Sequence, residues 1–192
     1  MRKIMKNEDA FTGLEAAIVL IAFIVVAAVF SYVILGAGFF TTQKSQEVVH
    51  TGVAQTSSSI EIVGDVIGKA DVTNQKLTSV LVTVSLSAGQ GVVDFDNVVV
   101  TYADANAVKT LTHGSDVSAG SWYVSDRQNS DGDTGNLLEP FEQFTLSIGI
   151  PSEAGTVSVN HPFTVEIKPS VGAPYAVKRT TPPQFTAVNI LR

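Results

Sequence analysis

The stretch that decides the fold is AAIVLIAFIVVAAVFSYVILGAGFF, residues 16–40, which contains no charged side chain. Ile, Val, Leu, Ala and Phe recur on every face of a helix drawn through it, so such a helix has no polar side to turn toward water. About 20 apolar residues suffice to cross a bilayer. The stretch therefore predicts a helix that is buried in lipid or against other protein, and the sequence allows both.

The predicted helix extends beyond the apolar stretch. Residues 41–57 are polar but keep Val48, Val49 and Val53 at near-helical spacing, with no proline and a single glycine. The whole helix, from about residue 11, would be about 65 to 70 Å long at about 1.5 Å per residue. A membrane anchor does not need that length, so the extra turns indicate a further structural role.

After the helix, the spacing of apolar residues changes to a period of two. Residues 80–86 and 144–150 alternate in the manner of half-buried strands. Further strand candidates, separated by turns rich in Gly, Asp, Asn and Pro, are residues 60–67, 98–102, 122–124, 163–167, 175–178 and 185–191. About eight short strands without intervening helices predict a β-sandwich of immunoglobulin-like type. The expected fold class is α+β, a long N-terminal hydrophobic helix followed by an all-β domain with an immunoglobulin-like sandwich fold.

Composition argues against several classes of function. The chain of 192 residues has no cysteine, which excludes disulfides, thiolate metal sites and a cysteine nucleophile. Its net charge is −6 and no basic run follows the apolar stretch, so nucleic-acid binding has no electrostatic basis. His50, His113 and His161 share no metal-ligand spacing, and no nucleophile elbow or phosphate-binding glycine loop occurs. We expect a protein that is not an enzyme and has no metal or cofactor.

The strongest candidate for a metal-binding segment is DRQNSDGD, residues 126–133. In an alignment that puts Gly132 at the sixth position of an EF-hand loop, Arg127 falls at the first position and Leu138 at the twelfth. Carboxylates are required at both ends of that loop. The segment is therefore predicted to be an exposed turn, with a calcium site as the alternative.

The residues ahead of the apolar stretch have the form of a processing signal. Residues 2–9 hold three basic residues and then an acidic pair, and AFTGLE follows at residues 10–15. An ordinary secretory signal has its small-residue cleavage site after the apolar stretch, whereas here the small residue Ala10 precedes it. Cleavage at Ala10 leaves the apolar helix in the mature protein, which gives the helix a lasting structural task.

This arrangement resembles the class III signal of type IV pilins and archaellins, the archaeal flagellins, in which a membrane peptidase cuts just before the helix. Phe11, Thr12 and Glu15 match the pilin pattern, while Gly13 and the segments at residues 18–29 and 62–68 are more similar to archaellins. The resemblance is specific from about residue 11 to residue 68.

The resemblance implies cleavage between Ala10 and Phe11, with the bond after Gly13 as the second choice. Two features depart from the family pattern. Ala10 stands where glycine is commoner, and Glu8 and Asp9 stand where basic residues are usual. No Asn-x-Ser/Thr sequon occurs, a further departure from many archaellins.

A resemblance to archaellins also implies a domain plan and a set of partners. The parts would be a cleaved signal peptide at residues 1–10, a polymerisation helix at residues 11–57 and an outer β-sandwich at residues 58–192. The chain would form the extracellular archaellum filament for swimming, as a homopolymer or together with other archaellins. Before assembly it would be held in the cell membrane, meeting the prearchaellin peptidase and then the assembly and motor machinery.

Small residues in the helix are the candidates for helix–helix contact, because they allow close approach between backbones. They are Gly13, Ala22, Ala27, Ala28, Gly36 and Ala37. Glu15 lies at the aqueous edge of the apolar stretch, and an unpaired carboxylate is costly in a dry core. By resemblance to pilins it would pair with the new α-amino group of Phe11 in another subunit. The alternative is that Glu15 stays at the interface and favours the start of the helix through the helix dipole.

Two other functions share parts of this pattern. A type IV adhesion pilin would have the same signal and helix, and would support attachment rather than swimming. A membrane-anchored β-domain that binds sugar or metal would use the apolar stretch only as an anchor, and would stay monomeric in detergent.

Overall fold

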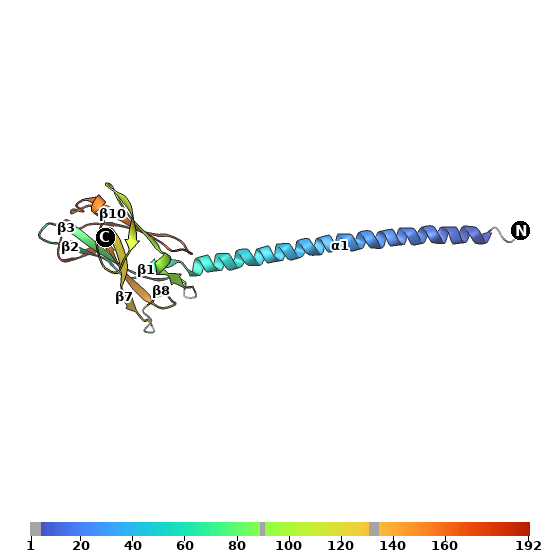
Figure 1. Ribbon diagram of the computed structural model, residues 1–192, viewed down its shortest axis with the longest axis horizontal. Helices are drawn as coiled ribbons and strands as arrows, with labels where there is room; N and C mark the ends of the chain where they lie inside the picture. The colour runs from blue at the N-terminus through green and yellow to red at the C-terminus, as the bar shows by residue number, and fades with distance from the viewer. Residues whose placement is uncertain (1–4, 89–90, 131–134) are drawn as a thin grey trace. The chain divides into compact units, whose positions relative to one another are not determined.

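The computed structural model describes residues 5–88, 91–130 and 135–192, with the side chains described from Gly13 onward. The chain forms two compact units, Met1–His50 and Thr51–Arg192. From Met5 onward the first unit is helix, and the second contains the last turns of the helix and the strands of the described residues (Figure 1).

Helix α1 spans Met5–Ser57, 53 residues, or about 80 Å at about 1.5 Å per residue. It contains no proline. Thr41, Thr42 and Thr56 donate their hydroxyl groups to carbonyl oxygens one turn earlier, which satisfies these polar side chains within the helix. The predicted long helix is confirmed. It begins ahead of residue 11 because no proline or glycine interrupts the residues before it, and acidic residues near a helix N-terminus are favourable.

Twelve strands lie in the part of the chain that the structure describes. They are β1 Ile60–Ile62, β2 Val66–Asp71, β3 Lys76–Leu86, β4 Val93–Asp94, β5 Val99–Asp104, β6 Val108–His113, β7 Ser121–Gln128, β8 Leu137–Leu138, β9 Gln143–Gly149, β10 Pro162–Lys168, β11 Tyr175–Thr180 and β12 Val188–Leu191. Short 3₁₀ helices occupy Phe95–Asn97 and Ser152–Ala154. We call residues 58–192 the β-domain.

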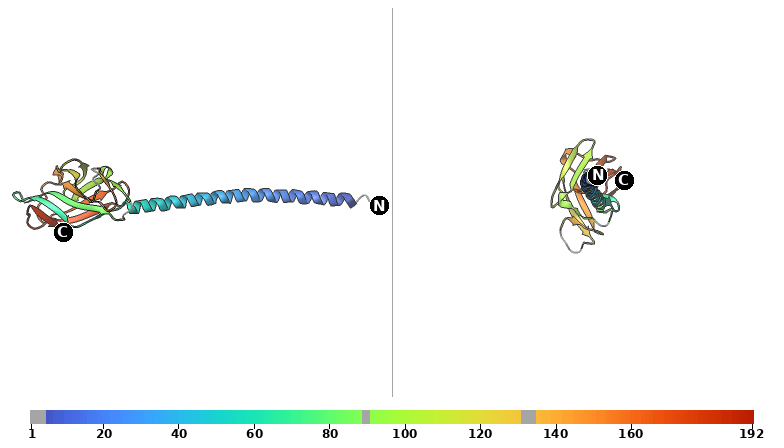
Figure 2. Two further views of the ribbon diagram at one scale, coloured as in Figure 1. Left: turned by 90° about the horizontal axis from the view of Figure 1, so that it is seen from below. Right: turned by 90° about the vertical axis from the view of Figure 1, so that its right-hand side faces the viewer.

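The main sheet runs in the order β11-β10-β5-β6-β7-β9-β3-β2-β12, and β1 also pairs with β3. Its pairs are antiparallel except at the short parallel contact between β6 and β7. The two ends of the path approach each other where the N–H of Thr180 donates to the backbone oxygen of Arg192 at 2.8 Å. The sheet is therefore nearly barrel-shaped, with its strands curving round a common interior (Figure 2). The expected fold class, a long helix followed by an all-β domain, is confirmed.

The predicted strands are present with shifted ends, and some strands were not expected. The candidate at residues 60–67 is two strands, because Gly64 has φ 78° and turns the chain between β1 and β2. Strand β6 was missed because it is largely exposed and so lacks an apolar alternation. The candidate at residues 185–191 is in strand only from Val188, although Phe185 is fully buried.

The core of the β-domain fills the inside of this sheet. On β3, Val80, Val82 and Val84 are fully buried, which is the period-two face that the sequence predicted. The largest fully buried side chains are Trp122, Tyr102, Phe95, Phe144, Phe163 and Phe185. A domain of this size can bury enough apolar surface to fold as one unit.

Candidate functional site

The surface of α1 is apolar on all sides and uncovered by its own chain. From Gly13 to His50 every residue is exposed, including Phe23, Phe30 and Leu35. The segment Gly13–Ser57 is long and apolar enough to cross a membrane. A helix that is apolar on every face requires burial in lipid or in protein.

The small residues proposed for helix packing do not form a single stripe on α1. At about 100° per residue, Ala27 and Ala28 lie about 140° and 240° round the axis from Ala22, and Gly36 about 320°. An added Cβ at Gly13 or Gly36 would meet nothing within 4 Å in the chain. Close approach is thus open on several faces, as a helix with several helical neighbours requires.

Charged side chains are sparse along α1. Glu15 stands one residue before the uncharged stretch and is exposed. Lys44 and Glu47 form an ion pair within the helix, Nζ to Oε2 2.6 Å. Because the two charges compensate each other, this part of α1 can pack against a neighbouring helix at a lower desolvation cost than an unpaired charge would impose.

The predicted cleavage site lies in the first turns of α1, where the backbone of Ala10 and Phe11 is helical. Residues 1–4 of the proposed signal peptide lie outside the described residues.

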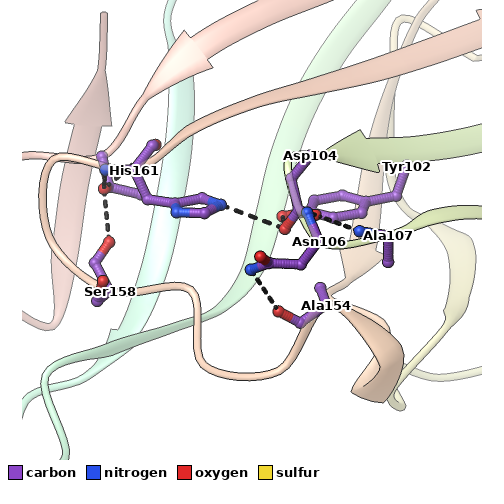
Figure 3. A network of polar contacts seen from close by, with 8 residues as sticks. Tyr102, Asp104, Asn106, Ala107, Ala154, Ser158 and His161 are labelled. Carbon is purple, nitrogen blue, oxygen red and sulfur yellow. Dashed lines mark hydrogen bonds and ion pairs between the residues drawn. The ribbon is translucent and has the colours of Figure 1, made fainter.

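A buried polar network in the β-domain centres on Asp104, which the sequence did not single out. Its Oδ1 accepts hydrogen bonds from the backbone N–H groups of Asn106 and Ala107, both at 2.7 Å. Its Oδ2 accepts from the hydroxyl of Tyr102 at 3.0 Å and lies 3.2 Å from Nε2 of His161. Figure 3 shows the carboxylate between the Tyr102 and His161 side chains.

Burial and hydrogen bonding act in opposite directions on Asp104. The side chain is 0% exposed, and burial by itself raises the pKa of a carboxyl group. Hydrogen bonds from Ala107, Asn106, Tyr102 and His161 outweigh burial, so the pKa of Asp104 is lowered below its usual value. Burial and the neighbouring Asp104 carboxylate raise the pKa of Tyr102 well above its ordinary value. Asp104 is therefore an ionised, fully hydrogen-bonded carboxylate.

This network is a structural joint between strands. Tyr102 and Asp104 belong to β5, and the chain just before β10 supplies His161. The backbone N–H of His161 donates a hydrogen bond to the hydroxyl of Thr181 at 2.7 Å. The Tyr102 ring also stacks on Phe163 of β10, with ring centroids 5.9 Å apart. These contacts stabilise the pairing of β5 with β10. Each carboxylate oxygen of Asp104 already has two hydrogen-bond partners.

The remaining histidines and the acid-rich segment are spread over other parts of the chain. His50 is exposed on α1. His113 stacks on Trp122, with ring centroids 4.5 Å apart, and its Nδ1 lies 3.6 Å from Oδ1 of Asp96. In the segment 126–133, Asp131, Gly132 and Asp133 lie outside the described residues, so the turn there and its calcium alternative stay predictions.

Similarity to known proteins agrees with this architecture. Residues 10–179 match the family of archaeal-type flagellins. The chain is 43% identical to Probable flagellin 1 of Archaeoglobus fulgidus, over 98% of each chain. Its structure is similar to a chain of the archaeal flagellum of Methanospirillum hungatei strain JF1, with a TM-score of 0.68 and 35% identity over 93% of this chain and 98% of that one. Flagellin FlaB1 of Methanocaldococcus jannaschii shares the fold, with a TM-score of 0.61 and 18% identity over 70% of this chain and 96% of that one.

A long helix with an uncovered apolar surface, joined to a β-domain, defines a class of proteins that bury this helix in a membrane or in an assembly. The chain belongs to the archaeal-type flagellin family. As an archaellin it is a subunit of the extracellular archaellum filament, serves motility and is not an enzyme. The family match decides for the archaellin over the adhesion pilin and the anchored binding domain.

Proposed function

We propose that α1 is the surface through which this archaellin polymerises, and that the β-domain faces water. The observation that carries the proposal is the uncovered apolar surface on every face of α1. Burying a side chain such as Phe23 or Ile34 contributes about 1.5 to 3 kcal/mol. Many such side chains on each helix hold the filament together without covalent links.

The same surface explains a precursor stage in the membrane. Before assembly the apolar helix needs a partner, and the segment Gly13–Ser57 is long enough for a bilayer to supply it. Transfer from lipid to the filament exchanges one apolar surrounding for another. The cell membrane, the prearchaellin peptidase and the assembly and motor machinery are the partners that this route requires.

Processing would create the N-terminus of the mature subunit. Cleavage between Ala10 and Phe11 removes residues 1–10 and leaves Glu15 near a new α-amino group. In the dry core of a filament an unpaired carboxylate is costly, so pairing of Glu15 with the amine of Phe11 in a neighbouring subunit would relieve that cost. N-terminal sequencing of the assembled subunit is expected to read Phe11 first. A start at Met1 would contradict processing, and a start at Leu14 would move the cut to the second choice.

Bulk or charge on α1 tests the packing of the helices. Ala28→Arg introduces a charge in the middle of the apolar stretch, and Ala27→Trp fills a position open to close approach. Both variants are expected to keep a folded β-domain but to give no filaments in electron micrographs of sheared cells. Gln43→Arg, in the polar part of α1, serves as the control that adds the same charge outside the apolar stretch. Normal filaments from both test variants would show that these faces are not buried.

A further inference from the structure

Phe141 is an exposed aromatic residue at a turn position whose backbone conformation is unfavourable for a bulky side chain. It is 85% exposed, the largest value among the large apolar side chains described in the β-domain. The N–H of Glu142 donates to the carbonyl oxygen of Glu139 at 3.2 Å, which closes a turn with Pro140 and Phe141 at its centre. Phe141 has φ 71°. Proline followed by a residue of positive φ is the pattern of a type II turn, where glycine or asparagine is favoured at the second central position.

Surrounding contacts hold the turn in this strained conformation. The carboxylate of Glu142 accepts a hydrogen bond from the N–H of Glu139 at 2.9 Å. The side-chain amide of Asn129 donates to the carbonyl oxygen of Phe141 at 3.3 Å. A bulky residue of positive φ is a genuine outlier, and such strain gathers at functional positions. Phe141 neither packs in its own subunit nor fits its turn, which indicates a contact outside the subunit.

A pocket of about 390 Å³ lies at the opposite end of β9 from Phe141. Its apolar walls include Leu77, Val117, Ile150 and Pro151. Val117 is 43% exposed, so the pocket has an apolar rim that is open to solvent. We call it the β9-end pocket. Phe141 precedes β9 and Ile150 follows it, so the two features are about 25 to 30 Å apart at about 3.3 Å per residue.

We propose that Phe141 inserts into the β9-end pocket of the next copy of this chain in the filament. The occupant is a second copy because the subunits form a polymer and the β-domain of each copy therefore has copies around it. Charges on the two surfaces are complementary, since Glu139 is exposed beside Phe141 and Lys76 is the charged residue that lines the pocket. A contact between two different surfaces of one chain is heterologous, and it propagates along an open helix instead of closing into a dimer.

This contact adds a second assembly surface to the one on α1. It does not depend on where the precursor is cut or on which faces of α1 pack. Loss of α1 packing would prevent filaments altogether, whereas the contact through Phe141 is tested within filaments that have formed.

Because the chain has no cysteine, two introduced thiols report on one contact. Phe141→Cys and Val117→Cys are combined in the full chain, produced in cells that lack the unaltered subunit. Sheared filaments are treated with a short bismaleimide and run on a denaturing gel. The expected result is a ladder of dimers, trimers and longer chains, because each subunit carries both halves of the contact.

The matched control combines Phe141→Cys with Val171→Cys, which is 50% exposed and is not part of the pocket. We expect several-fold more ladder from the test pair than from the control pair. Equal ladders from the two pairs, or a product that stops at dimers, would overturn the proposal.

A second experiment keeps Phe141 in place in case its replacement prevents assembly. Glu139→Lys and Lys76→Glu are made singly and together, and the temperature at which purified filaments dissociate is measured. Each single change is expected to lower that temperature because it places like charges at the contact, and the double change is expected to restore it. No recovery in the double variant would contradict the assignment of the pocket.

Discussion

Replacing Asp104 by alanine removes the centre of the buried network in the β-domain. The change leaves the hydroxyl of Tyr102 and the N–H groups of Asn106 and Ala107 without the acceptor that each has now. A buried donor that loses its partner costs about 1 to 3 kcal/mol. Tyr102 is fully buried, whereas water can partly replace the acceptor at Asn106, which is exposed. We expect Asp104→Ala to lower the free energy of unfolding by about 3 to 5 kcal/mol, with the loss dominated by Tyr102 and Ala107.

Chemical denaturation of the isolated β-domain, followed by the fluorescence of Trp122, measures this loss directly. Trp122 is the single tryptophan of the chain and is fully buried. Asp65→Ala, at an exposed aspartate, is the control and is expected to change the free energy of unfolding by less than about 0.5 kcal/mol. If Asp104→Ala unfolds within about 1 kcal/mol of the unaltered domain, the network does not stabilise the fold as argued.

The lowered pKa of Asp104 also gives a pH dependence with a definite sign. In the unfolded chain the pKa of an aspartate is about 3.9. Because the pKa of Asp104 is lower in the folded state, its contribution to stability is present above about pH 4 and is lost as the pH falls through the folded value. Asp104→Asn is therefore expected to weaken the decline in stability between about pH 4 and pH 2. An unchanged acid decline in this variant would show that Asp104 is not linked to folding.

Two further predictions concern the second compact unit, which is the β-domain together with the last turns of α1. A chain beginning at Thr51, where the second compact unit begins, is expected to be a soluble monomer rich in strand that unfolds cooperatively. Circular dichroism and sedimentation measure these properties. A disordered product, or filaments formed by this chain, would contradict the prediction. Phe141→Gly in that chain is expected to raise the free energy of unfolding by about 0.5 to 1 kcal/mol. The left-handed conformation costs a bulky residue about 1 to 2 kcal/mol, and the extra freedom of glycine in the unfolded chain offsets part of that gain. A lower stability would show that Phe141 makes contacts within its own subunit.

The sequence predicted α1 well because the physical requirement there is local. Residues 16–40 lack charge, and an unbroken helix satisfies its own backbone hydrogen bonds whatever surrounds it. The strands with a period-two apolar face, such as β3 and β9, were also predictable. Strand β6 was not, because its exposed side chains carry no such period and its place depends on pairing with β5 and β7.

The features that sequence reasoning missed depend on contacts between distant parts of the chain. Asp104 followed by Asn106 is a sequence signal for a turn. Its partner His161, however, reaches it only because β10 pairs with β5, a pairing that no local pattern specifies. Pro140 likewise predicts a turn, but the positive φ of Phe141 follows from the hydrogen bonds of Asn129 and Glu142.

The central claim is that α1 is buried in the filament, whereas the surface of the β-domain outside the contact through Phe141 faces water. Val26→Cys in the middle of α1 and Val108→Cys on β6, each the only thiol in its chain, allow a direct measurement. Purified filaments are labelled with a polar maleimide, intact and after dissociation in detergent. Val26→Cys is expected to be protected in intact filaments and to react fully after dissociation, whereas Val108→Cys is expected to react in both. Labelling of Val26→Cys in intact filaments at the rate seen after dissociation would contradict the burial of α1.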